Sequence, residues 1–265
     1  QQYASYFNSL KLLEMNCKKS EDFQAFMTEL SRKNENQPRN LYGLSFIRSE
    51  FEKDELNTLQ QFIISENIQC LELHDAINRN TMLHFYTQFL AMSMMKNLKI
   101  LNLDHTKNIS NDISVIVPKC SNLIALSLAD CGIEVSEVLF QLSRLLKLRT
   151  LNLSNNTCRK VINGLPPNIT TLYLNSVNWC FQTLQLFLTN LPRHHLTLHL
   201  SNISMQQNSD YDDLFVKLPT SRSNFLTGLS WDGNRIEQSL FDFLGKNKSL
   251  TFLSLSNCFS STNEK

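Results

Sequence analysis

The sequence is poor in glycine, with only six glycines in 265 residues and none of them grouped. Loops that bind phosphate or a dinucleotide need clustered glycines, so the chain has no motif for either ligand. The patterns C-x-x-C, H-E-x-x-H and G-x-S-x-G are also absent, which removes the usual motif signs of a redox centre, a zinc protease or a hydrolase nucleophile. We therefore expect a protein that is not an enzyme and that holds neither a cofactor nor a metal ion.

Long apolar runs and an excess of one charge are missing as well. No run of about 18 apolar residues could span a membrane, and the first residues, QQYASYFNSL, lack the charged-then-apolar order of a signal peptide. The formal net charge is only +1. Because attraction to phosphates dominates nucleic-acid binding, this near-neutral balance predicts no nucleic-acid partner.

Cysteine is present in an odd number, and its spacings suggest no disulfide framework. The seven residues are Cys17, Cys70, Cys120, Cys131, Cys158, Cys180 and Cys258. Disulfides are rare in reducing compartments, so unpaired thiols of this kind predict a cytoplasmic protein.

A short pattern, Leu-x-x-Leu-x-Leu-x-x-Asn/Cys, recurs along the whole chain. Its clearest copies are LIALSLADC from Leu123, LRTLNLSNN from Leu148 and LTFLSLSNC from Leu250, and seven weaker copies bring the total to ten. The second leucine position of successive copies recurs every 21 to 31 residues, at Leu13, Leu44, Leu71, Leu101, Leu126, Leu151, Leu172, Leu198, Leu229 and Leu253.

The alternation inside each copy predicts a short strand with one buried face. We expect the ninth-place Asn or Cys to turn inward and satisfy backbone groups, and Trp231, in a leucine position, to enter the core. Most links have helical spacing. The expected helices are Ser20–Leu30 with Ser20 as N-cap, Thr81–Asn97, Glu134–Lys147, Phe181–Leu191, Asp210–Leu218 and Gln238–Asn247. The link TCRKVINGLPPN from Thr157 is the exception, because Pro166 and Pro167 forbid a helix there; an irregular or 3₁₀ turn and a local change in curvature are expected.

These copies resemble the leucine-rich repeat superfamily, and their lengths resemble its ribonuclease-inhibitor-like branch. The resemblance implies an α/β solenoid, a horseshoe of about ten repeats with a parallel concave sheet and convex helices. It covers residues 1–265 as a single domain, and the lack of a polar cap at either end predicts a fragment of a longer array. LSWDGNRI beside SLFDFLGKN is similar to the CARMIL family of actin-capping regulators, and GLPPNITTLYL resembles repeats of bacterial effectors.

Polar residues at the outward places of the copies are the candidate contacts. An acidic group on neighbouring strands has three alternative interpretations, a solvated surface, a partner contact and a metal or acid–base site. Its members are Glu72, His74, Asp75, Asn102, Asp104 and His105, followed by Asp130 in the next repeat. Tyr173 and His199 lie farther along the same row. Charge reversal at Asp75 and Asp104 is expected to weaken a basic partner without lowering the melting temperature. The neighbouring His194 and His195 are interpreted as a degraded repeat rather than as a ligand pair.

The resemblance implies a non-enzymatic scaffold whose concave face binds another protein. Three alternatives belong to other classes: the substrate-recognition part of a larger enzyme or effector such as a ubiquitin ligase, a CARMIL-like regulator of actin assembly, and a self-assembly element that forms a homodimer through its ends or an edge strand.

Overall fold

The computed structural model describes ten stretches of the chain: residues 12–15, 20–31, 41–49, 51–75, 93–107, 109–111, 113–192, 194–205, 214–216 and 225–260. The chain forms two compact units, an N-terminal unit of residues 1–128 and a C-terminal unit of residues 129–265. Each unit is described by itself below. That residues 1–265 form a single domain stays a prediction.

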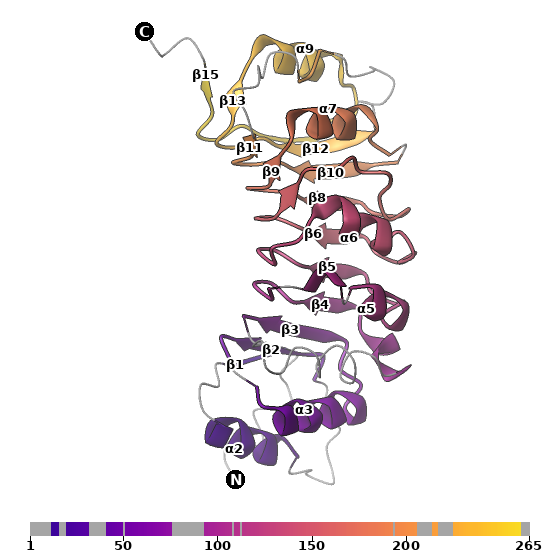
Figure 1. Cartoon of the computed structure of the whole chain (residues 1–265), viewed down its shortest axis with the longest axis vertical. Coiled ribbons are helices and arrows are strands. Elements are labelled where there is room, and N and C mark those ends of the chain that lie inside the picture. Colours follow the sequence, from indigo (N-terminus) through magenta and orange to yellow (C-terminus); the bar gives the residue numbers. More distant parts are fainter. Residues whose placement is uncertain are drawn as a thin grey trace. The chain divides into compact units, whose positions relative to one another are not determined.

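Five parallel strands form the sheet of the N-terminal unit (Figure 1). They are β1 (Leu12–Met15), β2 (Gly43–Ile47), β3 (Cys70–His74), β4 (Ile100–Asn102) and β5 (Ala125–Ser127). Each strand pairs with the next, and the predicted leucines meet in register: Leu13 with Leu44, Leu44 with Leu71, Leu71 with Leu101, and Leu101 with Leu126.

The C-terminal unit repeats this arrangement with β6 (Thr150–Asn152), β8 (Thr171–Tyr173), β10 (Leu196–His199), β12 (Leu226–Ser230) and β14 (Phe252–Ser254). Leu151 pairs with Leu172, Leu172 with Leu198, Leu198 with Leu229, and Leu229 with Leu253. Within each unit the strands follow the predicted order and register. The chain is thus an α/β leucine-rich repeat protein, as its sequence pattern predicts.

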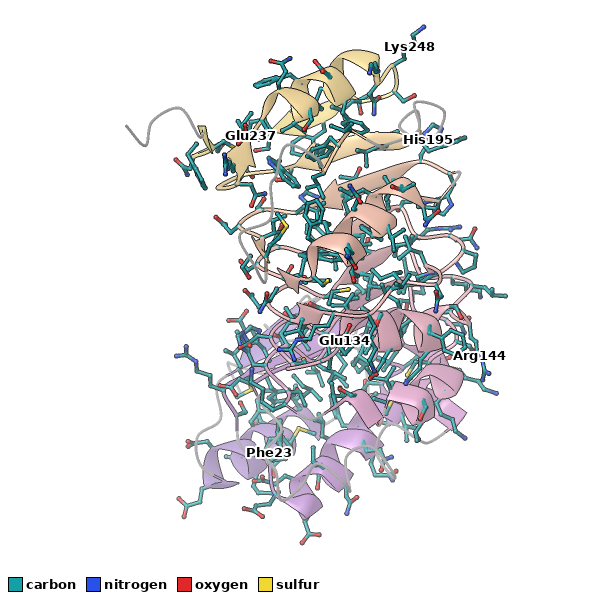
Figure 2. The ribbon with its side chains drawn as sticks, turned by 45° about the horizontal axis from the view of Figure 1, so that its top comes forward. Phe23, Glu134, Arg144, His195, Glu237 and Lys248 are labelled. Atoms are coloured by element: carbon teal, nitrogen blue, oxygen red, sulfur yellow. The ribbon has the colours of Figure 1, made fainter. Side chains whose placement is uncertain are left out.

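Helices connect most of the strands. The N-terminal unit contains α2 (Ser20–Ser31), α3 (Lys53–Ser65) and α5 (Ile113–Lys119), with 3₁₀ turns η2 (Ser93–Asn97) and η3 (Ile109–Asn111). The C-terminal unit contains α6 (Val135–Leu142), α7 (Phe181–Thr189) and α9 (Gln238–Lys246). Apolar side chains join the helices to the sheet; Phe23 of α2, labelled in Figure 2, lies 5.4 Å from Phe51 and 6.1 Å from Phe46 between ring centroids.

Four of the six expected helices are confirmed, as α2, α6, α7 and α9. Helix α2 begins at Ser20 itself, so the prediction of Ser20 as the N-cap was one residue late. Of Thr81–Asn97 only Ser93–Asn97 is described, as a 3₁₀ turn; of Asp210–Leu218 only residues 214–216 are, as a turn. The remainder of both lies outside the described residues. Helices α3 and α5 were not predicted.

Short second strands follow several of the main ones. β7 (Thr157–Cys158), β9 (Asn178–Trp179) and β11 (Ser204–Met205) form a three-stranded parallel sheet, and β13 (Arg235–Ile236) pairs with β15 (Phe259–Ser260). These strands were not predicted, because two residues are too few to show an alternating pattern.

The link that carries Pro166 and Pro167 is irregular, as predicted, since no helix lies between β7 and β8. Hydrogen bonds hold its end in place. The Arg149 guanidinium donates to the Asn168 carbonyl at 2.7 Å, and the Asn168 amide donates to the Leu146 carbonyl at 2.7 Å. The expected change in curvature stays a prediction.

The ninth-place asparagines turn inward, as predicted. The Asn156 side chain accepts from the backbone N–H groups of Cys131 and Ile133, both at 3.1 Å, and donates to the carbonyls of Leu153 and Ser154. Asn234 accepts from the Ile203 N–H at 2.8 Å and donates to the Leu200 carbonyl. The Asn156 amide therefore satisfies backbone groups of two successive repeats, and the Asn234 amide satisfies two backbone groups of the repeat before its own.

The eighth place of the copies bends the chain through the left-handed region. Its φ angles lie between 50° and 68° at Arg48, Asp75, His105, Asp130, Asn155, Ser176, Asn202, Gly233 and Asn257. Asn and Asp tolerate this region better than most residues, so their frequency at the eighth place has a conformational cause. At Gly233 a Cβ would lie 1.9 Å from the Asn202 Oδ1, so any other residue there would displace the Asn202 side chain.

The six described cysteines form no disulfide with one another, and four of them are buried. Burial raises the pKa of the Cys70 thiol to about 11 and that of the Cys120 thiol to about 12. Such thiols are weak nucleophiles. Cytoplasmic location stays a prediction. Among the helices of the described ranges, none is long and apolar enough to cross a membrane.

Candidate interaction surface

The predicted contact residues fall into two groups. Glu72, His74, Asp75, Asn102 and Asp104 belong to the N-terminal unit, whereas Tyr173 and His199 belong to the C-terminal unit. The structure brings each group together within its own unit.

In the N-terminal unit the group lies on β3, β4 and the turns that follow them. Glu72 and Asn102 are direct neighbours in register. The His74 ring lies 4.6 Å from that of His105, and the Asp75 N–H donates to the Asp104 carbonyl at 3.0 Å. The first group is therefore one continuous polar surface of half-buried and exposed side chains, except at Asp104.

Asp104 departs from what we expected of it. Its side chain is only 9% exposed, and its Oδ1 accepts a hydrogen bond from the Ser127 hydroxyl at 2.6 Å. Reversing this charge would remove that bond and bury a cation, which costs stability. We therefore expect charge reversal at Asp104 to lower the melting temperature, and Asp75, which is exposed, is the residue suited to a test of binding alone.

Three aromatic rings cross the sheet of the C-terminal unit, and we call Tyr173, His199 and Phe252 the aromatic stripe. Tyr173 and His199 are stacked, with ring centroids 4.2 Å apart and planes 13° from parallel. The His199 and Phe252 centroids lie 6.1 Å apart. Phe252 is 46% exposed, so the stripe offers apolar area to solvent.

Phe252 was not among the predicted contact residues, although it occupies the outward third place of the last copy. The intervening strand β12 explains how Phe252 approaches His199. Its residue in register with Phe252 is Gly228, which has no side chain to separate the two rings. This outward third-place position was the signal that could have identified Phe252.

Beside the stripe, Asp232 collects hydrogen bonds from four serines. Its carboxylate accepts from the hydroxyls of Ser254 at 2.6 Å, Ser230 at 2.8 Å and Ser201 at 3.2 Å, and from the Ser256 N–H at 2.7 Å. The Asp232–Ser254 contact has the same repeat positions as the Asp104–Ser127 contact. An aspartate in the seventh place thus links its own repeat to the fifth-place serine of the next.

The two titratable groups nearest the stripe have shifted pKa values. Burial lowers the pKa of His199, with a smaller opposing effect from the Asp232 charge, so the ring that stacks on Tyr173 is neutral at pH 7. For Asp232, burial by itself raises the pKa, but the hydrogen bonds from the serines outweigh it and the pKa lies below 3.8. The surface therefore combines a neutral aromatic stripe with one fixed negative charge.

Replacing Asp232 with asparagine is expected to destabilise the C-terminal unit by about 2 kcal/mol at pH 7, because hydrogen bonds to a charged group are lost or weakened. Since the pKa of Asp232 is lower in the folded than in the unfolded protein, its stabilisation is present above about pH 4 and is lost as pH falls through the folded-state value. Urea midpoints at pH 7 and pH 3 measure both effects.

Asp242→Asn is the matched control, because Asp242 is exposed and accepts a local bond from Gln238 of the same helix. It should leave the midpoint nearly unchanged. If Asp232→Asn and Asp242→Asn behaved alike at pH 7, the serine cluster would have no structural role.

The other candidates show no catalytic arrangement. A ring nitrogen of His194 lies 2.6 Å from the Ile169 carbonyl, while His195 is exposed. Within the described stretches, no three His, Cys, Asp or Glu side chains gather as metal ligands do. That the protein has no metal site, cofactor or enzymatic activity stays a prediction.

No family model and no curated protein sequence matches the chain. Solved structures do resemble it. An internalin, InlF, from Listeria monocytogenes aligns with a TM-score of 0.47 and 17% identity over 84% of this chain and 63% of its own. TLR13 in a complex with the single-stranded RNA ssRNA13 aligns with a TM-score of 0.47 and 15% identity over 96% and 45%. The chain spans less than two thirds of the length of either structure, and its repeat class follows from its own strands and register.

Proposed function

We propose that the protein is a non-enzymatic scaffold that binds another protein through the outward face of its sheet. The aromatic stripe is the observation that carries the proposal. Tyrosine and other aromatic residues are enriched in protein interfaces, where they contribute large contact areas. A half-buried stack of Tyr173 on His199 is held in place before binding, so little side-chain freedom is lost on contact.

The polar group of the N-terminal unit fits the same proposal. Glu72 and Asp75 contribute negative charge, and the neighbouring rings of His74 and His105 add aromatic surface beside it. Such side chains fit the polar rim of an interface, where charge favours selectivity and encounter over affinity. A partner with basic side chains suits this rim.

We also propose that the chain belongs to the ribonuclease-inhibitor-like branch, that it is cytoplasmic and that it has no nucleic-acid partner. The resemblance to the CARMIL family adds actin regulation as an alternative role, and a substrate-recognition part of a larger enzyme is another. Self-assembly is a third: Leu253 of β14, an edge strand of the main sheet, is 43% exposed, as a strand available to a second copy would be.

The experiment compares proteins captured by the wild-type chain with those captured by a Tyr173→Ala, Phe252→Ala double variant. The matched control is Phe140→Ala, which removes an aromatic ring that is 71% exposed on α6. We expect the double variant to lose a specific partner that the control retains, with a loss of affinity of at least about tenfold, or 1.4 kcal/mol.

The opposite result contradicts the proposal. A partner retained by the double variant and lost by Phe140→Ala would place the interface on the helices rather than on the sheet. Light scattering over a dilution series separates self-assembly, because a homodimer would dissociate on dilution.

A further inference from the structure

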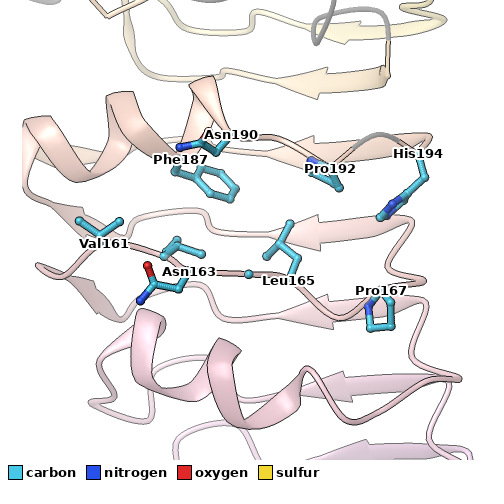
Figure 3. A pocket seen from close by; sticks show the side chains of 10 residues that line it. Val161, Asn163, Leu165, Pro167, Phe187, Asn190, Pro192 and His194 are labelled. Atoms are coloured by element: carbon cyan, nitrogen blue, oxygen red, sulfur yellow. The ribbon is translucent and has the colours of Figure 1, made fainter.

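The link between β7 and β8 leaves a notch in the layer of helices. Helices α6 and α7 lie on either side, whereas the repeat between them has an irregular chain in the corresponding place (Figure 3). A cavity of about 530 Å³ lies at this position. Figure 3 shows its lining side chains extending alongside α7, from Val161 at one end to Pro167 and His194 at the other.

The notch is lined by apolar side chains from the link and from α7, and by the polar side chains of Asn163, Asn190 and His194. Leu165, Pro167 and Phe187 form much of its wall, together with Ile162 and Pro192. Val161 is 46% exposed, and Leu186, which directly precedes Phe187 on α7, is 42% exposed. This place, where neighbouring repeats carry a helix, therefore offers apolar surface to solvent.

Hydrogen bonds fix the link that forms the notch. At its start the Glu134 carboxylate accepts from the Arg159 N–H at 3.0 Å. At its end His194 contacts the Ile169 carbonyl and Arg149 holds the Asn168 carbonyl. The notch is thus formed before any ligand arrives, and binding would require little ordering of the chain.

The sequence around the notch is more basic than the net charge of the whole chain indicates. Residues 138–209 contain no Asp or Glu at all, although the chain has 24. The same stretch has six Lys and Arg, of which five are described and exposed: Arg144, Lys147, Arg149, Arg159 and Lys160. Lys160 pairs with Glu137, which lies just before the stretch, so the other four supply most of the positive charge. Arg149 and Asn168 place part of this charge beside Pro167 in the lining. The Arg144 label in Figure 2 marks its exposed side chain near the end of α6.

We propose that the notch binds an amphipathic α-helix of a partner protein, with an apolar face against Leu165 and Phe187 and acidic side chains toward the basic residues around it. A helix fits because it would take the place that a helix occupies in the adjacent repeats. Acidic flanks fit because opposite charge steers association and suppresses wrong partners. The notch is formed by the link between two strands, whereas the aromatic stripe lies on the outward face of the sheet. This site is therefore additional to the proposed scaffold surface.

Single-stranded nucleic acid is the alternative ligand for a basic surface. The helix is favoured because the notch offers apolar side chains, Leu165 and Phe187 among them, with a basic residue, Arg149, beside it. Among the residues that line it, none is Tyr or Trp, and Phe187 is the one aromatic besides His194. Bases would have little to stack upon there.

The test uses two synthetic peptides of about 16 residues, long enough to form helix in part. Both have leucine at helical spacing on one face, and the other positions are mostly glutamate in one peptide and mostly lysine in the other. We expect the Leu/Glu peptide to bind at least about tenfold more tightly than the Leu/Lys peptide, a difference of 1.4 kcal/mol. Fluorescence anisotropy in physiological salt measures the affinities.

Gly164→Trp is the blocking variant. Gly164 lines the cavity, and a Cβ built there meets no atom within 4 Å. A large side chain therefore has room at this edge of the notch without disturbing the surrounding structure. Gly245→Trp is the matched control, because Gly245 of α9 also has open space around its Cβ position. Gly164→Trp should weaken the Leu/Glu peptide at least about tenfold, whereas Gly245→Trp and Tyr173→Ala should not change its binding. Circular dichroism melts of all variants check that they fold.

Each other outcome overturns the inference. Equal binding of the two peptides would remove the charge argument, and binding that survives Gly164→Trp in a folded protein would place the peptide elsewhere. A single-stranded oligothymidylate that bound more tightly than the Leu/Glu peptide would assign the basic surface to nucleic acid. Loss of peptide binding in Tyr173→Ala would transfer it to the sheet face.

Discussion

Asn156→Ala is expected to lower the free energy of unfolding of the C-terminal unit by about 2 to 6 kcal/mol. The side chain is 3% exposed, and its removal leaves the N–H groups of Cys131 and Ile133 without their amide acceptor. Each buried and unsatisfied donor costs about 1 to 3 kcal/mol. The Leu153 carbonyl also loses the donor that Asn156 supplies.

The neighbouring residue supplies the control for this prediction. Asn155 is exposed and has φ +58°, a conformation that glycine adopts readily, so Asn155→Gly should change the stability by less than about 1 kcal/mol. Denaturant unfolding followed by circular dichroism measures both variants. Similar midpoints for the two variants would show that the inward amide does not hold successive repeats together.

Trp231→Ala is expected to destabilise the same unit by about 3 to 5 kcal/mol, the usual range for removing a large buried ring. Trp231 is fully buried, as its leucine position predicts. Its ring lies 5.2 Å from that of Phe215, and its indole N–H donates to the Arg235 carbonyl at 3.0 Å. The substitution would therefore open a cavity and leave a carbonyl without that donor.

Two further variants separate these effects. Trp231→Phe keeps much of the ring and removes the indole donor, so it should cost about half as much or less. Phe241→Ala, in which the lost ring is 49% exposed, should cost about 1 kcal/mol or less. A thermal or urea midpoint for Trp231→Ala equal to that of Phe241→Ala would contradict the assignment of Trp231 to the core.

The strands could be predicted because the repeat pattern follows from a physical constraint, the burial of one face of each strand. Each leucine position has to be buried, and a shift of one residue would turn those leucines to solvent. The observed pairing of Leu71 with Leu101, or of Leu172 with Leu198, follows from that constraint. The short strand β9 and helix α5 were missed because neither has a pattern long enough to recognise.

The candidate site was only partly predictable. Outward places could be identified, and they correctly grouped His74 with Asp104 and Tyr173 with His199 within each unit. Their individual surroundings could not: the burial of Asp104 depends on Ser127 of the next repeat, a contact across 23 positions of sequence. The acid-free stretch of residues 138–209 was visible in the sequence, but the near-zero net charge concealed it.

The sequence by itself determined the repeat, the strand register and the inward asparagines, because each depends on burial or hydrogen bonding at a fixed place in every copy. Only the tertiary structure decided which polar side chains face solvent, which are held by serines, and where the missing helix leaves a notch. Those features depend on side chains from neighbouring repeats, 19 to 23 residues apart, and no single copy contains that information.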